Sequence, residues 1–206
     1  MRGNLGRPTS RANQRHRARS ALIDAAAVLT RAGRVPTMIE VAVTALVSTA
    51  TAYRYFPGVG DLLRAVALRE VETWAEHLGS ELPDDPERRM SVLVGVVSGA
   101  QLDNETLWRG VLSAGIDRGP TDSDAARDTY AKSVGQLRVA LVRAVLAPLE
   151  TSLGPERYRR LVLATTLVCG AEAMVAARDG CGLGPGEAAD TIEWAARALL
   201  RAAISE

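Results

Sequence analysis

The chain of 206 residues has the length of one large domain, or of a small domain joined to a medium one. Hydrophobic residues make up 47% and aromatic residues only 4%, which favours helices over sheets and excludes a disordered chain. The net charge of +1 hides an asymmetry, because residues 1–60 contain nine arginines against Asp24 and Glu40 and so carry +7, leaving −6 for the remainder. A basic head on a mildly acidic body suggests a polyanionic partner for the head alone.

Features of secretion or membrane insertion are not evident in the sequence. The first twenty residues contain no apolar stretch of the signal-peptide kind. The longest weakly charged run, residues 161–177, is interrupted by Glu172 and is shorter than a bilayer span. Cys169 and Cys181 are interpreted as free thiols, with a redox switch as the less favoured alternative. We therefore expect a soluble cytoplasmic protein that does not interact with membranes.

The N-terminal region is predicted to form a basic arm followed by a helix. Residues 1–13, MRGNLGRPTSRAN, are rich in glycine, proline and arginine, and we expect them to be flexible. Helical periodicity begins near Arg15 and stops at Gly33. Arginines at 2, 7, 11, 15, 17 and 19 have no acidic neighbour in this segment. The arm can neutralise DNA phosphates or enter the minor groove, and a solubilising tail is the alternative.

Two short helices are predicted between residues 37 and 57. Thr37 has the position of an N-cap, and Glu40 three residues later completes the spacing of a capping box. Ser48 is a good N-cap for the second helix, which ends before Pro57. Two such helices joined by a short turn form a helix-turn-helix.

The remaining sequence predicts only helices. Their predicted ranges are separated by clusters of glycine, proline and aspartate and are approximately 61–78, 87–101, 103–116, 123–150, 155–179 and 186–204. The predicted fold is therefore all-α, with about nine helices. A helix-turn-helix domain over residues 14–59 precedes a helical bundle over residues 60–206.

A helix-turn-helix places the first turn of its second helix in the major groove. Residues 49–51 of VSTATAYRYFP are small enough to let that helix lie deep, while residues 53–55 can reach back to phosphates and Phe56 can hold the helix to the core. Capping of the two helices without DNA contact is the alternative role for the hydroxyl residues. The predicted DNA-contacting residues are Arg11, Arg15, Thr37, Ser48, Thr49, Ala50, Thr51, Tyr53, Arg54 and Tyr55.

The stretch PTMIEVAVTALVSTATAYRYFPGVGDLLRAV, residues 36–66, resembles the DNA-binding signature of the tetracycline-repressor (TetR) family of transcriptional regulators. LIDAA at 22–26 resembles the first helix of that family, and WAARALLRAAI at 194–204 suits its last. The resemblance implies a homodimer that binds double-stranded, palindromic operator DNA, most often as a repressor released by a small-molecule effector. The matching positions are Thr37, Val41, Ala42, Ala45, Val47, Ser48, Thr51, Tyr53, Tyr55, Phe56 and Leu62.

Three positions depart from the family pattern. Leu46 replaces the turn glycine and must either avoid positive φ or tolerate about 1 kcal/mol of strain. Val59 replaces the lysine that usually opens the fourth helix, and Thr30 replaces a phenylalanine late in the first. These departures leave open a TetR-like ligand-binding or interaction dimer that has lost specific DNA binding.

The resemblance also implies that the last two helices pair with those of a second chain in a four-helix interface. Stripes along both helices agree with this, although the same stripes would suit an intramolecular core. The predicted interface residues are Leu161, Thr165, Val168, Ile192, Ala195 and Leu199.

An effector site is predicted from polar and polarisable side chains on otherwise aliphatic helices. Each of them could alternatively be an ordinary core or surface residue. Glu172 is the only charge between Arg160 and Arg178, so if it is buried its partner is either an effector or an Arg or Tyr of another helix. The predicted effector-contacting residues are Trp74, His77, Trp108, Tyr130, Cys169 and Glu172.

Enzyme activity is not predicted. Only two histidines occur, and the metal-protease, Cys-x-x-Cys, Walker and dinucleotide-binding motifs are absent from the sequence. The glycine-rich GCGLGPG at 180–186 follows a predicted helix rather than a strand, which argues against a phosphate-binding loop. We expect no catalytic residue, metal or cofactor.

Overall fold

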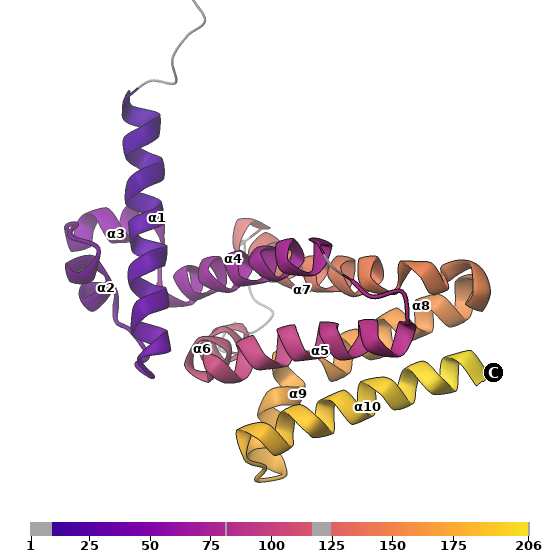
Figure 1. Ribbon diagram of the computed structural model, residues 1–206. Coiled ribbons are helices and arrows are strands. Elements are labelled where there is room, and N and C mark those ends of the chain that lie inside the picture. Colours follow the sequence, from indigo (N-terminus) through magenta and orange to yellow (C-terminus); the bar gives the residue numbers. More distant parts are fainter. Residues whose placement is uncertain (1–9, 81, 117–124, 206) are drawn as a thin grey trace, which may run out of the picture.

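The computed structural model describes residues 10–80, 82–116 and 125–205. Every regular element in these ranges is a helix and none is a strand, so the all-α prediction is confirmed for the described part of the chain. Figure 1 shows two parts: a small head at the N-terminal end and an elongated helical body that ends at the C-terminus.

The head contains α1 (Ser10–Arg31), α2 (Met38–Thr44) and α3 (Thr49–Tyr55). The inward face of α1 buries Leu22 and Ala26 completely, and α2 contributes Val41 and Ala42 to the same core. The predicted capping box at the start of α2 is present. Thr37 Oγ1 accepts a hydrogen bond from the Glu40 backbone N–H (3.2 Å), and Glu40 Oε2 accepts one from the Thr37 backbone N–H (2.8 Å).

The body is a bundle in which α4 runs out of the head and packs on α6 and α7, while α10 packs against α5 and α8. Its elements are α4 (Val59–Ser80), α5 (Pro86–Asp103), α6 (Glu105–Ile116), α7 (Ala125–Leu146), the 3-10 turn η1 (Ala147–Leu149), α8 (Glu150–Val168), α9 (Ala171–Val175), the π turn η2 (Ala176–Gly180) and α10 (Pro185–Ser205). By length and apolar composition, no single helix of the described part could span a bilayer, although one bent pair, Val134–Val168 with Ala171–Gly180, passes the same test jointly.

Three helix boundaries differ from the sequence-based ranges. The first helix begins at Ser10 rather than near Arg15, because the arginine, alanine and glutamine residues after Pro8 are good helix formers. The predicted break near residue 154 is a bend inside α8, where Gly154 has φ 72°. The helix predicted over 155–179 is interrupted at Cys169 and Gly170, and a Cβ on Gly170 would clash with Glu172 Oε2. Hydrophobic periodicity continues on both sides of that interruption, so the pattern did not reveal it.

A buried arginine joins the first turns of α4 to the end of α6. The Arg64 side chain is 2% exposed, pairs with Asp61 (3.0 Å) and donates to the Ala114 backbone carbonyl (2.8 Å). A buried charge of this kind is tolerated only when it is paired and hydrogen-bonded, as it is here.

A second polar contact links α1 to the α5–α6 connection. The Asn104 side-chain amide donates to Thr30 Oγ1 (3.3 Å), and both residues are buried. Thr30, which stands where the family pattern has phenylalanine, therefore takes part in a polar link between head and body.

Candidate nucleic-acid interface and effector region

The turn between α2 and α3 is a Schellman motif with leucine at the position that glycine usually occupies. The Leu46 N–H donates to the Val43 carbonyl (3.1 Å), and the Val47 N–H donates to the Ala42 carbonyl (3.0 Å). Leu46 has φ 56° and its side chain is 93% exposed. The sequence left open whether Leu46 avoids a positive φ or tolerates the strain of one. The structure has the positive φ, with the strain that a Cβ causes there.

Ser48 caps α3 as predicted. Its Oγ accepts from the Thr51 backbone N–H (3.1 Å) and donates to Thr51 Oγ1 (2.9 Å). The first turn of α3 therefore has a fixed geometry, with the exposed Ala50 beside the half-buried Thr49 and Thr51. This arrangement presents small side chains at a helix N-terminus, as insertion into a groove requires.

The far side of α3 fixes the helix to the head. Phe56 is 4% exposed and Ala52 is fully buried, which confirms the predicted anchoring role of Phe56. The guanidinium of Arg19 lies 5.2 Å from the Phe56 ring centroid, so α1 also contacts this anchor.

The candidate phosphate contacts lie at the C-terminal end of α3. Tyr53 is 51% exposed, Arg54 is exposed, and Tyr55 is half-buried with the Arg54 guanidinium 5.6 Å from its ring centroid. An open concavity of about 660 Å³ lies between α3 and α1 and is lined by Gln14, Arg15, Ala18, Arg54 and Tyr55. The structure thus brings the predicted residues Arg15, Arg54 and Tyr55 to one depression.

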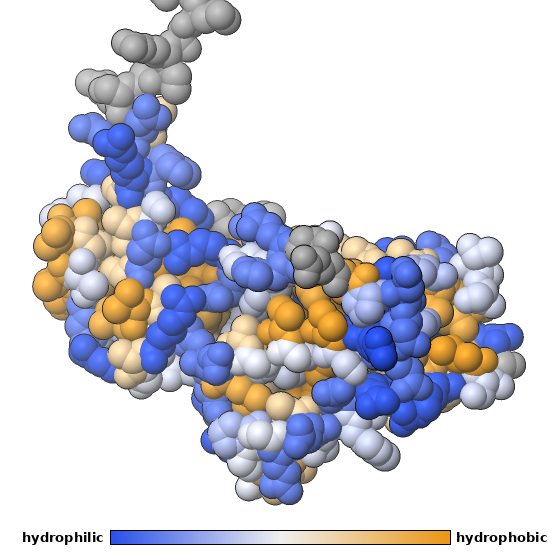
Figure 2. Space-filling view, viewed as in Figure 1, coloured by the Kyte–Doolittle hydropathy of each residue, from blue (hydrophilic) through white to orange (hydrophobic). Residues whose placement is uncertain are grey.

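The N-terminal part of α1 projects beyond α3, and hydrophilic side chains cover it (Figures 1 and 2). Arg15 and Arg17 are exposed there. Thr37 lies at the start of α2, where its hydroxyl group is already engaged with Glu40. The remaining predicted contact, Arg11, lies in α1, but its side chain is outside the described residues.

Two of the predicted effector residues form an aromatic pair inside the body. The Trp74 and Trp108 ring centroids are 5.2 Å apart with an interplanar angle of 32°, and both side chains are buried. Trp108 Nε1 has no hydrogen-bond partner among the described residues. His77 does not join them: it is exposed, and its Nδ1 contacts the Thr73 carbonyl at 2.8 Å. The side chain of Tyr130 is outside the described residues.

The predicted effector residue Cys169 is buried next to polar side chains that the sequence analysis did not single out. Burial raises the pKa of its thiol to about 12, against a smaller lowering by Arg138, so the thiol is protonated at neutral pH. Its carbonyl accepts from the Gln101 side-chain amide (3.3 Å). Three further buried polar atoms have no hydrogen-bond partner among the described residues: Ser98 Oγ, Gln101 Oε1 and Thr165 Oγ1. Apart from Cys169 itself, the sequence signal for these atoms was limited to isolated hydroxyl and amide residues within apolar helices.

Glu172 is exposed, so its charge does not need an effector to compensate for burial. Its Oε2 pairs with Arg138 of α7 at 3.3 Å, which is the arginine partner left open by the sequence. Arg138 in turn packs on the interruption between α8 and α9, because a Cβ on Gly170 would lie 3.0 Å from its Nη1. The pair therefore has a structural role at the start of α9.

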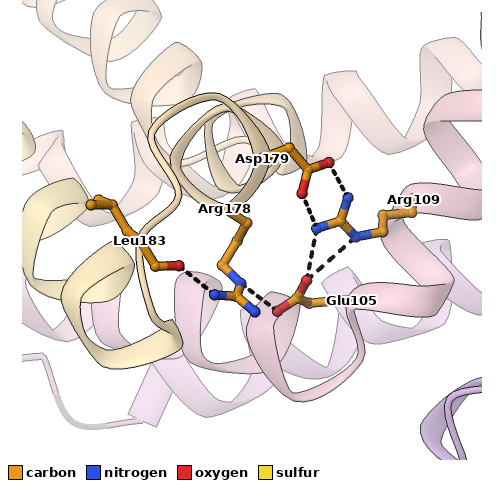
Figure 3. A network of polar contacts seen from close by, with 5 residues as sticks. All are labelled: Glu105, Arg109, Arg178, Asp179 and Leu183. Atoms are coloured by element: carbon orange, nitrogen blue, oxygen red, sulfur yellow. Dashed lines mark hydrogen bonds and ion pairs between the residues drawn. The ribbon is translucent and has the colours of Figure 1, made fainter.

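A network of charges ties the first turns of α6 to η2 (Figure 3). Glu105 accepts from Arg178 Nε (2.8 Å) and from Arg109 Nη2 (2.9 Å), and Arg109 also forms two bonds to Asp179 (2.5 and 2.9 Å). Arg178 reaches further to the Leu183 carbonyl. Burial raises the pKa of Glu105, but the hydrogen bonds and charges of the two arginines outweigh it and leave the pKa below its usual value.

The predicted dimer-interface residues need correction. Leu161, Thr165 and Ile192 are at most 5% exposed within the single chain, so they form its core and are not available to a partner. Val168, Ala195 and Leu199 are half-buried. The large exposed apolar side chains of these two helices are instead Leu163 (40%) and Leu167 (74%) of α8 and Trp194 (68%) and Ile204 (51%) of α10.

The arrangement of helices is shared with several solved structures. A TetR transcriptional regulator from Rhodococcus sp. RHA1 is 21% identical, with a TM-score of 0.60 over 90% of this chain and 97% of its own. A TetR-family regulator from Streptomyces coelicolor is 18% identical, with a TM-score of 0.62 over 94% of this chain and 83% of its own. The chain has the TetR-family regulator fold.

A third similar structure of the same fold is the fatty acid degradation regulator FadR from Bacillus halodurans, which is 15% identical with a TM-score of 0.58 over 89% of this chain and 94% of its own. No protein-family model matches the sequence, and no curated protein matches it either. Within the described residues of this TetR-like chain, no group of three or more His, Cys, Asp and Glu side chains could hold a metal ion.

Proposed function

We propose that the protein is a sequence-specific DNA-binding transcriptional regulator, acting as a homodimeric repressor that a small effector releases from a palindromic operator. The observation that carries the proposal is the capped first turn of α3. Thr49, Ala50 and Thr51 there are small and at least partly exposed, and Arg54 and Tyr55 at the other end of the same helix line a concavity with Arg15. Short side chains read base edges, while the arginines and tyrosines at the rim bind phosphates.

The reading helix is tested by the double variant Thr51→Ala with Tyr55→Phe. It removes one hydroxyl at the groove end of α3 and one at the phosphate end, while the buried anchors Ala52 and Phe56 stay in place. We expect operator affinity to fall at least about 30-fold, since each of the two lost contacts costs about 1–3 kcal/mol. The exposed Thr151→Ala in the body serves as control. Unchanged binding by the double variant would refute the assignment of α3.

Dimerisation follows from the docking geometry, because one helix-turn-helix makes few base contacts and paired heads read two half-sites. We place the second copy against the exposed side of α8 and α10, at Leu163, Leu167 and Trp194. Leu167→Asp should therefore shift the protein toward monomer in sedimentation velocity. It should also weaken operator binding without changing the helical circular-dichroism spectrum of the protein.

Effector binding is supported by the buried polar region of the body. Trp108 Nε1, Gln101 Oε1 and Thr165 Oγ1 are buried polar atoms that a hydrogen-bonding ligand or water could satisfy. The α6 helix, which carries Trp108, also contacts α1 and α4, so a ligand at Trp108 is positioned to move the head. Release requires that the effector binds better to the conformation in which the heads no longer match successive grooves. Quenching of tryptophan fluorescence in parallel with release of labelled DNA tests this step.

A further inference from the structure

The break between α8 and α9 brings together polar groups of α5, α7 and α8. The Cys169 carbonyl, at the C-terminal cap of α8, accepts a hydrogen bond from the Gln101 side-chain amide of α5 (3.3 Å). Gly170 follows, and the guanidinium of Arg138 from α7 lies so close to it that a Cβ there would be 3.3 Å from Arg138 Cζ. Gln101 and Arg138 therefore contact the two successive residues of the break.

The hydrogen-bonding capacity of this region is not exhausted within the described part of the chain. Arg138 Nε, Gln101 Oε1 and Thr165 Oγ1 are buried and have no partner there, and the Gln101 and Thr165 residues are at most 1% exposed. Ser98 Oγ is a fourth such atom. Ser98 lies one helical turn before Gln101, and Thr165 one turn before Cys169, so the four atoms follow two helix faces that meet at the break. Buried polar atoms are nearly always hydrogen-bonded in folded proteins, so these four are available to a ligand.

The chemistry of these atoms favours a ligand that accepts hydrogen bonds and carries a negative charge. Arg138 Nε can only donate, and the Ser98 and Thr165 hydroxyls can donate as well as accept, whereas Gln101 Oε1 can only accept. Donors thus outnumber dedicated acceptors, and one of the donors belongs to a cation. A carboxylate matches the edge of a guanidinium through two parallel hydrogen bonds.

Glu172 already holds a carboxylate near Arg138, but only loosely. Its Oε2 lies 3.3 Å from Arg138 Nη1, longer than the 2.7–2.9 Å of a strong charge-assisted hydrogen bond, and its side chain is 60% exposed. Ion pairs between exposed groups contribute little stability. A second carboxylate that also accepts from Arg138 Nε can therefore replace Glu172, whose own charge returns to water at low cost.

We propose that the effector is a small carboxylate, whose charged group binds Arg138 in place of Glu172 at the break between α8 and α9. This inference rests on the proposed effector response and names the chemical class of the effector. The Ser98 and Thr165 hydroxyls and the Gln101 amide bind further polar atoms of the same molecule. The rest of the molecule is apolar, because the buried residues one turn before these groups are Val94, Val97, Leu161 and Val162.

Displacement of Glu172 gives this site a route to the head. Glu172 lies in the first turn of α9, and its contact with Arg138 joins that short helix to α7. The α9 helix packs on α6, and α6 in turn contacts α1 and α4. A ligand that takes Arg138 from Glu172 therefore acts on α9 and, through α6, on the orientation of the head. Only the conformation with altered α9 binds the carboxylate fully, as population shift requires.

The test uses calorimetric titration of the DNA-free protein with three carboxylates: phenylacetate, 3-phenylpropanoate and octanoate. Each is compared with its primary amide, which has nearly the same shape without the charge. The variants are Arg138→Gln, Arg138→Lys and Glu172→Gln. The controls are Arg159→Gln on α8 and Glu187→Gln on α10, which change exposed charges of the body.

We expect at least one carboxylate to bind the wild type at least about tenfold more tightly than its amide. Arg138→Gln should bind the acid and the amide equally weakly, and Arg138→Lys should recover only part of the difference, because an ammonium cannot form two parallel bonds. Glu172→Gln should bind the carboxylate about two- to fivefold more tightly, because the competing group is gone. Both controls should behave as the wild type.

The proposal is overturned if none of the three carboxylates binds, if the amides bind as well as the acids, or if Arg138→Gln keeps full affinity. Glu172→Gln retains every buried group of the site, so it decides the question even if the Arg138 variants do not fold. A carboxylate affinity no higher than that of the wild type in this variant contradicts the displacement of Glu172.

The effector role is measured separately, by adding the bound carboxylate to the protein–operator complex. Release of labelled DNA by the acid but not by the amide is expected, and an operator complex that persists at saturating acid would refute the role. If the protein binds no DNA saturably but binds a carboxylate through Arg138, the proposed function fails while the site stands.

Discussion

Replacing Leu46 by glycine should stabilise the protein, although leucine is the larger hydrophobic residue. Leu46 holds φ 56° at the C-terminal end of α2, where a Cβ approaches the following carbonyl oxygen. That conformation costs an ordinary L-residue about 1–2 kcal/mol and costs glycine almost nothing. The leucine side chain is 93% exposed, so removing it gives up almost no buried area.

The opposing effect is the backbone freedom of glycine in the unfolded chain, which costs about 0.5–1 kcal/mol relative to alanine. The difference predicts that Leu46→Gly is more stable than Leu46→Ala by about 0.5–1 kcal/mol. Alanine is the matched control because it removes the same exposed side chain but keeps the Cβ. Both turn hydrogen bonds, from Leu46 and Val47, remain available in either variant.

Urea unfolding followed by far-ultraviolet circular dichroism, with equal m-values for the two variants, measures this difference. Binding of a single-operator probe should be unchanged, since the turn keeps its conformation. If Leu46→Gly is no more stable than Leu46→Ala, the positive φ is not strained, and the account of this turn is wrong.

Three further predictions concern the body. Replacing Arg64 by methionine removes its buried ion pair with Asp61 and its hydrogen bond to the Ala114 carbonyl, and should lower the free energy of unfolding by about 3–5 kcal/mol in urea titrations. The folded-state pKa of Glu105 is lowered, so its ion pairs stabilise the protein fully above the unfolded value near 4.5 and are lost as pH falls through the folded value. Glu105→Gln should therefore cost up to about 1 kcal/mol at pH 7, because the side chain remains 22% exposed, and progressively less in titrations below pH 4.5. Iodoacetamide at pH 8 should modify the exposed Cys181 in the folded protein, whereas Cys169 should react only after unfolding, as peptide mass spectrometry can show.

Local sequence signals predicted the helix caps of the head correctly. The Thr37–Glu40 capping box and the Ser48 N-cap depend on residues three apart, and spacing alone is sufficient to recognise them. The sequence left the conformation of Leu46 open, because a leucine at that position can either avoid a positive φ or adopt one with strain. The structure shows that the hydrogen bonds of the turn maintain the positive φ.

The body was harder to predict because its contacts join residues far apart in the chain. Leu161 and Ile192 were predicted to lie on interface stripes of two successive helices, but periodicity does not distinguish a surface for a second chain from one that packs on other helices of the same chain. Similarly, Glu172 was a conspicuous charge whose partner, Arg138, lies 34 residues away. Buried polar atoms such as Gln101 Oε1 become recognisable only when the surrounding helices are in place.

The central claim is that the head binds DNA in a sequence-specific manner, and a fluorescence-anisotropy titration tests it most directly. The probe is duplex DNA from immediately upstream of the protein's own gene, titrated at two salt concentrations with excess non-specific competitor. The account predicts saturable, competitor-resistant binding that weakens with salt, with a slope of about 0.9 per phosphate contact. It also predicts that Arg15→Ala lowers this slope by about 0.9, the value of one phosphate contact. Binding that any competitor abolishes equally would contradict the account and leave only non-specific attraction by a basic head.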